Sequence, residues 1–360
     1  MSTNRFNYTT IDILRGFAAT TVFLNHYGFI TLFRKLFKTD FIEIIGQIGA
    51  YYAVPLFFLI SGFCIHLSQL KQNSFSGSSQ LKLVPYLKRR FWRIYPAYLI
   101  ILLFACAVDA INGNKVSVLD FIVHVFVCQG FSIKYFNSIN VVLWTISVEI
   151  LFYLLYPIWY YFRSRFGLNQ ALLISVMVSL ISWTVIVLNY DSSILPIRYF
   201  ILNIWGAWCF GAWLCEQVVI KERIFIKEMS WWIVGIGLFI LFKVLSLYSW
   251  SGLITYNISI ALWAWVVVPF LKLEGKLTNI NNRFFAGIIK VLVVVGISSY
   301  SLYMIHEPFM FLRNALLQTI TSEKIRLLLG AFWLFATFVA AWISYQLFEK
   351  PFLSYRSSRK

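Results

Sequence analysis

Hydrophobic side chains fill long, nearly unbroken stretches of this chain, and short polar segments separate them. A helix needs about 20 mostly apolar residues to cross the hydrocarbon core of a bilayer. The stretches close to that length are 9–32, 48–70, 94–112, 141–162, 168–189, 197–219, 229–249, 253–271, 287–311 and 325–348. We therefore expect an all-α fold, a polytopic transmembrane helix bundle of about ten spans.

One further apolar stretch, 117–133, is shorter and contains Asp120, His124 and Gln129. We interpret it as a re-entrant or interfacial helix. With ten spans, the loops on the side of the N-terminus hold about twice as many Lys and Arg residues as the opposite loops. Because positive loops favour the cytoplasm, this bias predicts that both termini are cytoplasmic.

The composition agrees with a lipid environment. Of 360 residues, 60% are hydrophobic and 12% charged, whereas ordinary globular chains have about 45–50% and about 25%. The mean hydropathy is +0.76, so there is too little polar surface to cover a water-soluble core. We expect a single membrane-embedded domain over 9–351, a short basic cytoplasmic tail over 352–360, and no appended soluble domain.

The net charge of +17 fits basic cytoplasmic loops better than nucleic-acid binding, because no nucleic-acid-binding module is recognisable. The five cysteines form no CxxC pair and the four histidines no HExxH motif. We therefore expect membrane lipid as a partner, no nucleic acid and no metal.

Charged and titratable residues within spans are costly and are candidates for function. In the first span, Arg15 and His26 are eleven positions apart, which is about 20° beyond three helical turns and about 16 Å along the axis. They share one helix face, and Asp12 lies one turn before Arg15. The alternative is an interfacial ion pair plus a histidine that bonds a neighbouring helix.

The second span contains FFLISGF, in which Ser61 and Gly62 lie among aromatic residues. Small residues often allow two membrane helices to approach closely, and this structural interpretation is favoured. His66 follows near the cytoplasmic end, where we expect it to be interfacial.

The segment KRRFWRIYP, 88–96, places four cations beside the start of a span. Arg90 and Arg93 are three positions apart and face one way in a helix. A guanidinium fork suits phosphate oxygens. The residues alone favour a positive-inside anchor over a phosphate site.

Two later spans also contain polar clusters. Glu149 lies inside the span that begins near Trp144, with Ser147 two residues before it. A carboxylate there is protonated, paired or catalytic, and a hydrogen bond between helices is the structural alternative. The ninth stretch is interrupted by Ser301, His306 and Glu307, and the final FEKP places Glu349 at a charged helix end.

These segments, in this order, resemble the membrane acyltransferase-3 family, whose members are polytopic proteins that acylate carbohydrates. The resemblance covers Asp12 to Pro351. Its motifs are R-x10-H from Arg15 to His26, FF-x-x-SGF from Phe57 to Phe63, R-x-x-R before I-x-P from Arg90 to Pro96, W-[ST]-[LI]-S-x-E from Trp144 to Glu149, and SYSLY-x-x-H-x-P from Ser299 to Pro308. Each motif is weak alone, and the ordered set is specific.

The resemblance implies acetyl-CoA as acyl donor and a sugar hydroxyl as acceptor. His26 matches the family's catalytic histidine, and Arg15 matches its functional arginine, which would steer the donor. Arg90 and Arg93 match the pair that binds donor phosphates, and a cytoplasmic position suits them.

Further roles follow from the same resemblance. Glu149 would orient His26 or the acceptor hydroxyl, and Ser147 would donate a hydrogen bond to the oxyanion. His306 is a second candidate acid or base. Trp144, Ser61 and Tyr303 are candidate substrate-binding residues.

The family often acetylates bacterial surface polysaccharides. We therefore expect a multi-pass protein of the bacterial inner membrane that acts on a lipid-linked or polymeric carbohydrate, such as lipopolysaccharide O-antigen, capsule or exopolysaccharide. The alternative is a transporter or flippase for a lipid-linked sugar. Transporters often contain paired half-repeats with matching broken helices, and this sequence shows none.

Overall fold

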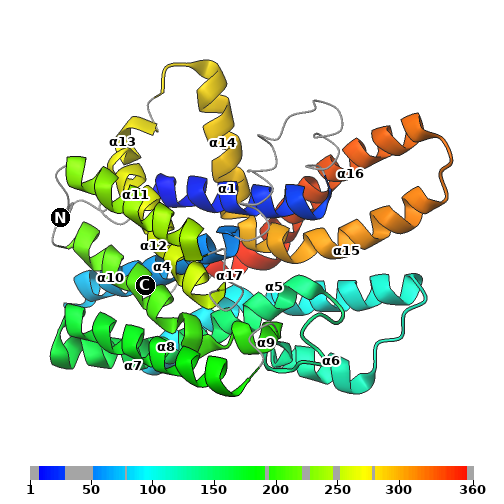
Figure 1. The fold of residues 1–360 in the computed structure, drawn as a ribbon. Helices are drawn as coiled ribbons and strands as arrows, with labels where there is room; N and C mark the ends of the chain where they lie inside the picture. The colour runs from blue at the N-terminus through cyan, green and yellow to red at the C-terminus, as the bar shows by residue number, and fades with distance from the viewer. Residues whose placement is uncertain are drawn as a thin grey trace. The chain divides into compact units, whose positions relative to one another are not determined.

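The computed structural model describes residues 8–28, 52–77, 79–190, 194–220, 228–245, 252–277 and 280–354, and every regular element in these ranges is helical (Figure 1). The helices are α1 (Thr9–His26), α4 (Ala53–Ser76), α5 (Leu83–Ile111), α6 (Val118–Val125), η3 (Gln129–Phe131), η4 (Val141–Leu143), α7 (Trp144–Phe166), α8 (Leu168–Asn189), α9 (Leu195–Arg198), α10 (Ile201–Val219), α11 (Glu228–Leu245), α12 (Gly252–Lys272), α13 (Glu274–Leu277), α14 (Arg283–Ile297), α15 (Ser299–Gln318), α16 (Glu323–Ser344), η6 (Tyr345–Glu349) and α17 (Lys350–Ser354). The predicted all-α fold class is confirmed.

Six of the described helices are long and apolar enough to cross a membrane, and a seventh span is counted if α14 and α15 form one. The count of ten spans and the cytoplasmic termini stay predictions. Parts of these predictions, including 29–32, 48–51 and 355–360, lie outside the described residues.

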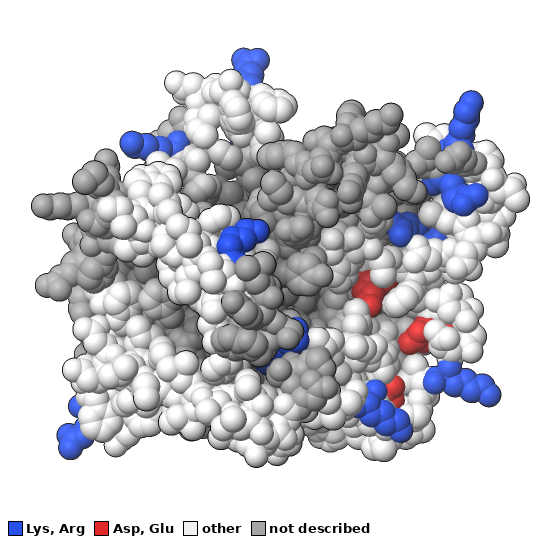
Figure 2. All heavy atoms as spheres, viewed as in Figure 1, with Lys and Arg blue, Asp and Glu red and all other residues white. Residues whose placement is uncertain are grey.

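On the face drawn in Figure 2, few charged side chains interrupt the described surface, as expected where helices face lipid.

Two predicted segments can be compared directly with the helices. The predicted span 287–311 is wrong as a single helix, because α14 ends at Ile297 and α15 begins at Ser299 with a bend of 79°. In the stretch 117–133, α6 has only eight residues, or about 12 Å, which is too short to span. Ser117 caps α6 by accepting a hydrogen bond from the Asp120 amide at 3.1 Å.

The chain divides into two compact units. The first comprises 1–18, 51–83 and 149–293, and the second comprises 19–50, 84–148 and 294–360. In the first unit α10 packs against α4, α8 and α12. Glycine allows the closest of these approaches, because a Cβ atom at Gly62 of α4 would lie 2.1 Å from the carbonyl oxygen of Trp208 in α10.

In the second unit α15 packs against α16, η4 and η6. The start of α5 joins this group, since the Trp92 ring stacks on Phe352 of α17 with centroids 5.4 Å apart. Tyr300 at the start of α15 donates a hydrogen bond to the carbonyl oxygen of Ile94 at 3.4 Å. Three of the polar motifs therefore meet within this unit: those of α5, α15 and the final FEKP.

Candidate active site

Two histidines that are 280 positions apart form a hydrogen-bonded pair in the second unit. His26 is the last residue of α1, and its Nδ1 lies 3.1 Å from Nε2 of His306 on α15. The other ring nitrogen of His306, Nδ1, lies 3.1 Å from the carbonyl oxygen of Leu302, one turn earlier. His306 is 1% exposed, whereas His26 is only partly buried.

The end of α1 is fixed by its neighbours. Arg313 of α15 donates a hydrogen bond to the carbonyl oxygen of Tyr27 at 3.1 Å, and its guanidinium lies 4.5 Å from the centre of the Tyr27 ring. The Tyr27 hydroxyl is 2.8 Å from the Thr337 hydroxyl of α16. A cation at a helix C-terminus satisfies carbonyl groups that lack helical partners. These contacts hold the backbone beside His26.

Hydrogen bonds around Pro308 join α15 to the segment just before Trp144. Proline lacks an N–H group, so the Met304 carbonyl, four residues earlier, loses its helical donor. The Asn140 side chain supplies that donor at 2.9 Å. The Glu307 carboxylate, 3% exposed, accepts a hydrogen bond from the Val142 amide at 3.3 Å. Together these two bonds fix η4, which leads directly into α7.

Glu149 has a defined partner in the first unit. Its carboxylate accepts a hydrogen bond from the Ser61 hydroxyl at 2.7 Å. The indole N–H of Trp208 in turn donates to the Ser61 oxygen at 3.1 Å. The polar residue of FFLISGF and the carboxylate of WTISVE thus belong to one hydrogen-bonded chain. Arg15 is partly buried and belongs to the same unit.

The predicted phosphate-binding residues lie on α5 in the second unit. Arg90 is 5% exposed, and its guanidinium lies 5.5 Å from the centre of the Tyr86 ring. Arg93 is partly buried. Arg90 is therefore buried, whereas a basic anchor at the membrane surface would be exposed.

Ser147 and Trp144 pack against the segment that follows α6. The Ser147 hydroxyl accepts a hydrogen bond from the Gly130 amide at 3.2 Å, and the side chain is 1% exposed. A Cβ atom at Gly130 would lie 2.7 Å from Cβ of Ser147, so only glycine fits there. The Trp144 ring stacks on Phe136 at 5.1 Å between centroids.

Two sequence interpretations are corrected by burial. Glu349 is not a charged helix end, because it is 5% exposed, ends the π-helical turn η6 and accepts a hydrogen bond from Ser301. Ser301 also lies 3.1 Å from the Ser344 hydroxyl. His66 is not an exposed side chain at a membrane interface, because it is 0% exposed. Both side chains belong to buried polar clusters.

The His66 cluster contains residues that the sequence interpretation missed. His66 Nδ1 is 2.9 Å from the Tyr156 hydroxyl, and Nε2 is 3.0 Å from a Glu216 oxygen. Arg163 donates two hydrogen bonds to the same carboxylate, at 2.9 and 2.8 Å. The sequence does contain one signal for this cluster, which is Glu216 in an otherwise apolar stretch. A carboxylate there needs a cationic partner from elsewhere in the chain.

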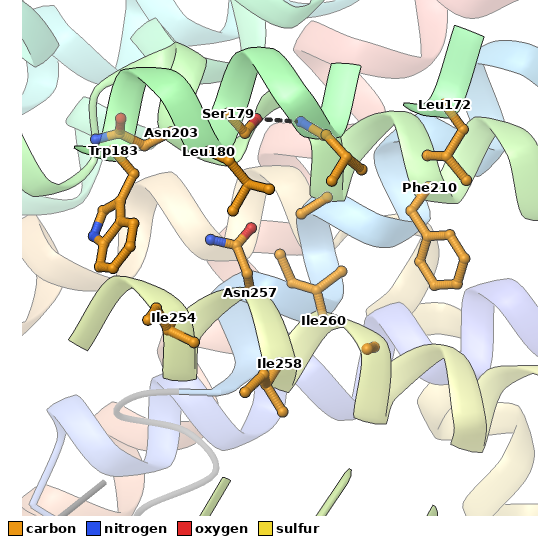
Figure 3. A pocket seen from close by; sticks show the side chains of 14 residues that line it. Leu172, Ser179, Leu180, Trp183, Asn203, Phe210, Ile254, Asn257, Ile258 and Ile260 are labelled. Atoms are coloured by element: carbon orange, nitrogen blue, oxygen red, sulfur yellow. Dashed lines mark hydrogen bonds between the residues drawn. The ribbon is translucent and has the colours of Figure 1, made fainter. Parts of the chain in front are cut away.

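An apolar groove of about 350 Å³ opens between α8, α10 and α12 of the first unit. Figure 3 shows Trp183 and Asn203 toward one end and Leu172 and Phe210 toward the other. No titratable side chain is among its lining residues. The titratable side chains that could carry chemistry therefore lie in the polar clusters and not in this groove.

The predicted site residues fall into two groups. The second unit holds His26, Arg90, Arg93, Trp144, Ser147, Tyr303 and His306, and the first holds Arg15, Ser61 and Glu149. Tyr303 lies edge-on to the His306 ring, with centroids 5.9 Å apart. Within the described ranges, no three His, Cys, Asp or Glu side chains gather as a metal site would require.

The chain is similar over much of its length to known proteins. A family model described as "Acyltransferase domain" matches residues 8–351. O-acetyltransferase OatA of Staphylococcus aureus is 24% identical over 323 residues, which cover 84% of this chain and 52% of OatA. Acyltransferase MdmB of Streptomyces mycarofaciens is 30% identical over 157 residues, 41% of this chain and 38% of MdmB. The chain thus spans about half the length of OatA and a smaller share of MdmB, and no solved structure matches.

Proposed function

Because the chain belongs to the acyltransferase family whose domain covers residues 8–351, we propose that it is an integral-membrane O-acetyltransferase. It moves an acetyl group from acetyl-CoA to a hydroxyl of a cell-surface carbohydrate. The observation that carries the proposal is the partly exposed His26 at the end of α1, whose Nδ1 is engaged by a buried second histidine. The similarity to an O-acetyltransferase, OatA, supports acetyl as the group that is transferred.

His26 acts as the general base. Its ring nitrogen takes the proton of the acceptor hydroxyl as the oxygen attacks the thioester carbonyl carbon. The carbon–sulfur bond then breaks, and the imidazolium returns the proton to the CoA thiolate. Imidazole suits both steps because it titrates near neutral pH.

Arg90 and Arg93 hold the donor phosphates. Guanidinium groups bind phosphate oxygens through paired N–H donors. Burial of Arg90 beside the Tyr86 ring restricts its side chain, so less conformational entropy is lost when a phosphate binds. Arg15 steers the acyl end of the donor.

The remaining candidate residues bind the acceptor and stabilise the oxyanion. Ser147 donates a hydrogen bond from its hydroxyl to the oxyanion, while its oxygen accepts the hydrogen bond from the Gly130 amide. Glu149 orients the acceptor hydroxyl through its bonded partner Ser61. Trp144 and Tyr303 supply aromatic surface, which sugars commonly pack against.

The acceptor is a lipid-linked or polymeric carbohydrate, such as lipopolysaccharide O-antigen, capsule or exopolysaccharide, at the bacterial inner membrane. Apolar helices of membrane-spanning length support a location in lipid. Both candidate donor-binding residues lie in one basic segment, which fits a donor that arrives from the cytoplasm.

The test uses purified protein in detergent with acetyl-CoA labelled in the acetyl group. We expect transfer to a carbohydrate acceptor or slow hydrolysis. Surface polysaccharide from host cells with and without the gene is compared for acetyl content. If the protein transfers no acetyl group but moves lipid-linked sugar across the membrane of reconstituted vesicles, it is a transporter.

His26→Ala provides the decisive variant. General base catalysis contributes about 10²–10⁴-fold, or roughly 3–5 kcal/mol of barrier, so transfer should nearly vanish. The Michaelis constant for acetyl-CoA should change little, since the phosphate site is elsewhere. Retention of more than about a tenth of wild-type transfer limits the effect to about 1.4 kcal/mol, too small for the essential base.

A further inference from the structure

We propose that His306 is a positioning residue that fixes the tautomer of His26, so that Nε2 of His26 is the basic nitrogen. This inference rests on the proposed acetyl transfer, since it names the atom of His26 that takes the proton. His306 does not touch the acceptor. It acts only through the hydrogen bond that joins the two imidazole rings.

The direction of each hydrogen bond follows from its partners. The Leu302 carbonyl oxygen only accepts, so Nδ1 of His306, 3.1 Å away, carries the proton. A neutral imidazole has one N–H group, which leaves Nε2 of His306 as an acceptor. His26 Nδ1, 3.1 Å from that nitrogen, must therefore donate. The lone pair of His26 is then on Nε2.

The argument requires that His306 be neutral, and its surroundings favour this. The ring is 1% exposed, and the Phe23 and Tyr303 rings lie edge-on to it, with centroids 6.4 and 5.9 Å away. Burial of a charge without a counter-ion is costly. A charged His306 would donate from both nitrogens and would reverse the bond to His26.

Hydrogen bonds to neighbouring backbone groups hold both histidines in place, which keeps the bond between their rings and therefore the tautomer of His26. The Asn140 bond to Met304 fixes the α15 backbone two residues before His306. Arg313 fixes the backbone of Tyr27, directly after His26. Among the described residues, the bond to His306 is the one hydrogen bond that the His26 side chain makes. Within the described part of the chain, its Nε2 has no partner, and we propose that the substrate hydroxyl binds there.

The consequence for catalysis resembles the role of the carboxylate in a Ser–His–Asp triad. The hydroxyl proton moves to Nε2 of His26, and the imidazolium keeps its Nδ1–H bonded to His306 until Nε2 gives the proton to the thiolate. In the triad, an orienting residue that imposes the wrong tautomer lowers kcat about 10⁴-fold. A neutral orienting group stabilises the imidazolium less, so we expect a loss of about 10²-fold without it.

The test compares two amides at position 306. His306→Gln places an amide oxygen near the former position of Nε2, where it can accept from His26. His306→Asn has the same amide group but is one methylene shorter and reaches only the former position of Nδ1. We expect kcat to fall about 10²-fold for His306→Asn and for His306→Ala, and less than about tenfold for His306→Gln. KM for acetyl-CoA should be unchanged in all three.

A second measurement needs no variant to be active. Nitrogen NMR of protein labelled at histidine nitrogens reports which ring nitrogen carries the proton, and His26→Ala identifies the His26 signals. We expect the proton of neutral His26 on Nδ1 in the wild type. A proton on Nε2 there, or equal kcat for the Gln and Asn variants, would overturn the inference. If the wild type transfers no acetyl group, the proposed function fails, while the NMR result still tests the histidine pair.

Discussion

Gly62→Ala should destabilise the first unit, because it adds a methyl group where α4 and α10 touch through their backbones. The new Cβ atom would lie 2.1 Å from the Trp208 carbonyl oxygen and 3.2 Å from the Ala212 amide nitrogen. Both atoms are backbone, so no side chain can rotate away. The distance between this Cβ atom and the oxygen must grow by about 1.5 Å to reach ordinary contact. The contact is reciprocal, since a Cβ atom at Gly211 would lie 2.1 Å from the Leu59 carbonyl oxygen.

Overpacking of this kind typically costs about 1–3 kcal/mol. Alanine also stiffens a helix, which stabilises by about 0.5–1 kcal/mol, so the net loss should be about 0.5–2 kcal/mol. Acetyl transfer should fall as well, because Ser61 beside Gly62 is held between Glu149 and the Trp208 indole. A shift of α4 would stretch both bonds.

The assay is thermal denaturation of the purified protein in detergent. One kcal/mol corresponds to about 2–4 °C in domains of 150–250 residues, so a decrease of several degrees is expected. Gly237→Ala on α11 is the matched control, because no atom of the described residues lies within 4 Å of the position that the added methyl group would take. It should leave the midpoint unchanged or raise it slightly. Equal midpoints for Gly62→Ala and the control would refute the close approach of α4 and α10.

Three other predictions concern charged groups. Replacing Arg90 and Arg93 together with Gln should raise KM for acetyl-CoA while the protein still inserts, and unchanged donor affinity would leave only the anchor interpretation. Glu149→Gln keeps the shape but removes the ionisable group, so acetyl transfer measured with labelled donor should fall, whereas full activity would indicate a structural role. Glu216→Ala leaves the buried end of Arg163 without its carboxylate, and breaking a buried pair costs about 3–5 kcal/mol. Arg163 is partly exposed and solvent screens part of this loss, so we expect the lower end, measured as a reduced denaturation midpoint at unchanged KM.

The sequence by itself determined the helical elements, because each depends on local hydrophobicity. Long apolar stretches can satisfy their backbone groups in lipid only as helices, and the predicted stretches coincide with described helices over most of their length. The bend between Ile297 and Ser299 was missed, since the residues around it are as apolar as those of a continuous span. Hydropathy reports burial in lipid and not the direction of the helix axis.

The sequence also marked most of the polar residues, because charged or titratable groups are rare in spans and stand out. It did not determine their partners. The bond between His26 and His306 joins residues 280 positions apart, and no periodicity in a single chain encodes such a distance. Helical spacing places Arg15 and His26 on one face, but a side chain on another helix decides which nitrogen of His26 can act.

The tertiary structure alone decided which polar groups are buried. The sequence positions of His66 and Glu349 predict helix ends, and packing instead buries each beside a hydrogen-bond partner from another helix. The sequence around Glu216 does not show its partners, and the structure places His66 and Arg163 beside its carboxylate. The physical reason is the same in each case. The free energy of a buried polar group depends on the partner that satisfies it, and that partner comes from a distant part of the chain.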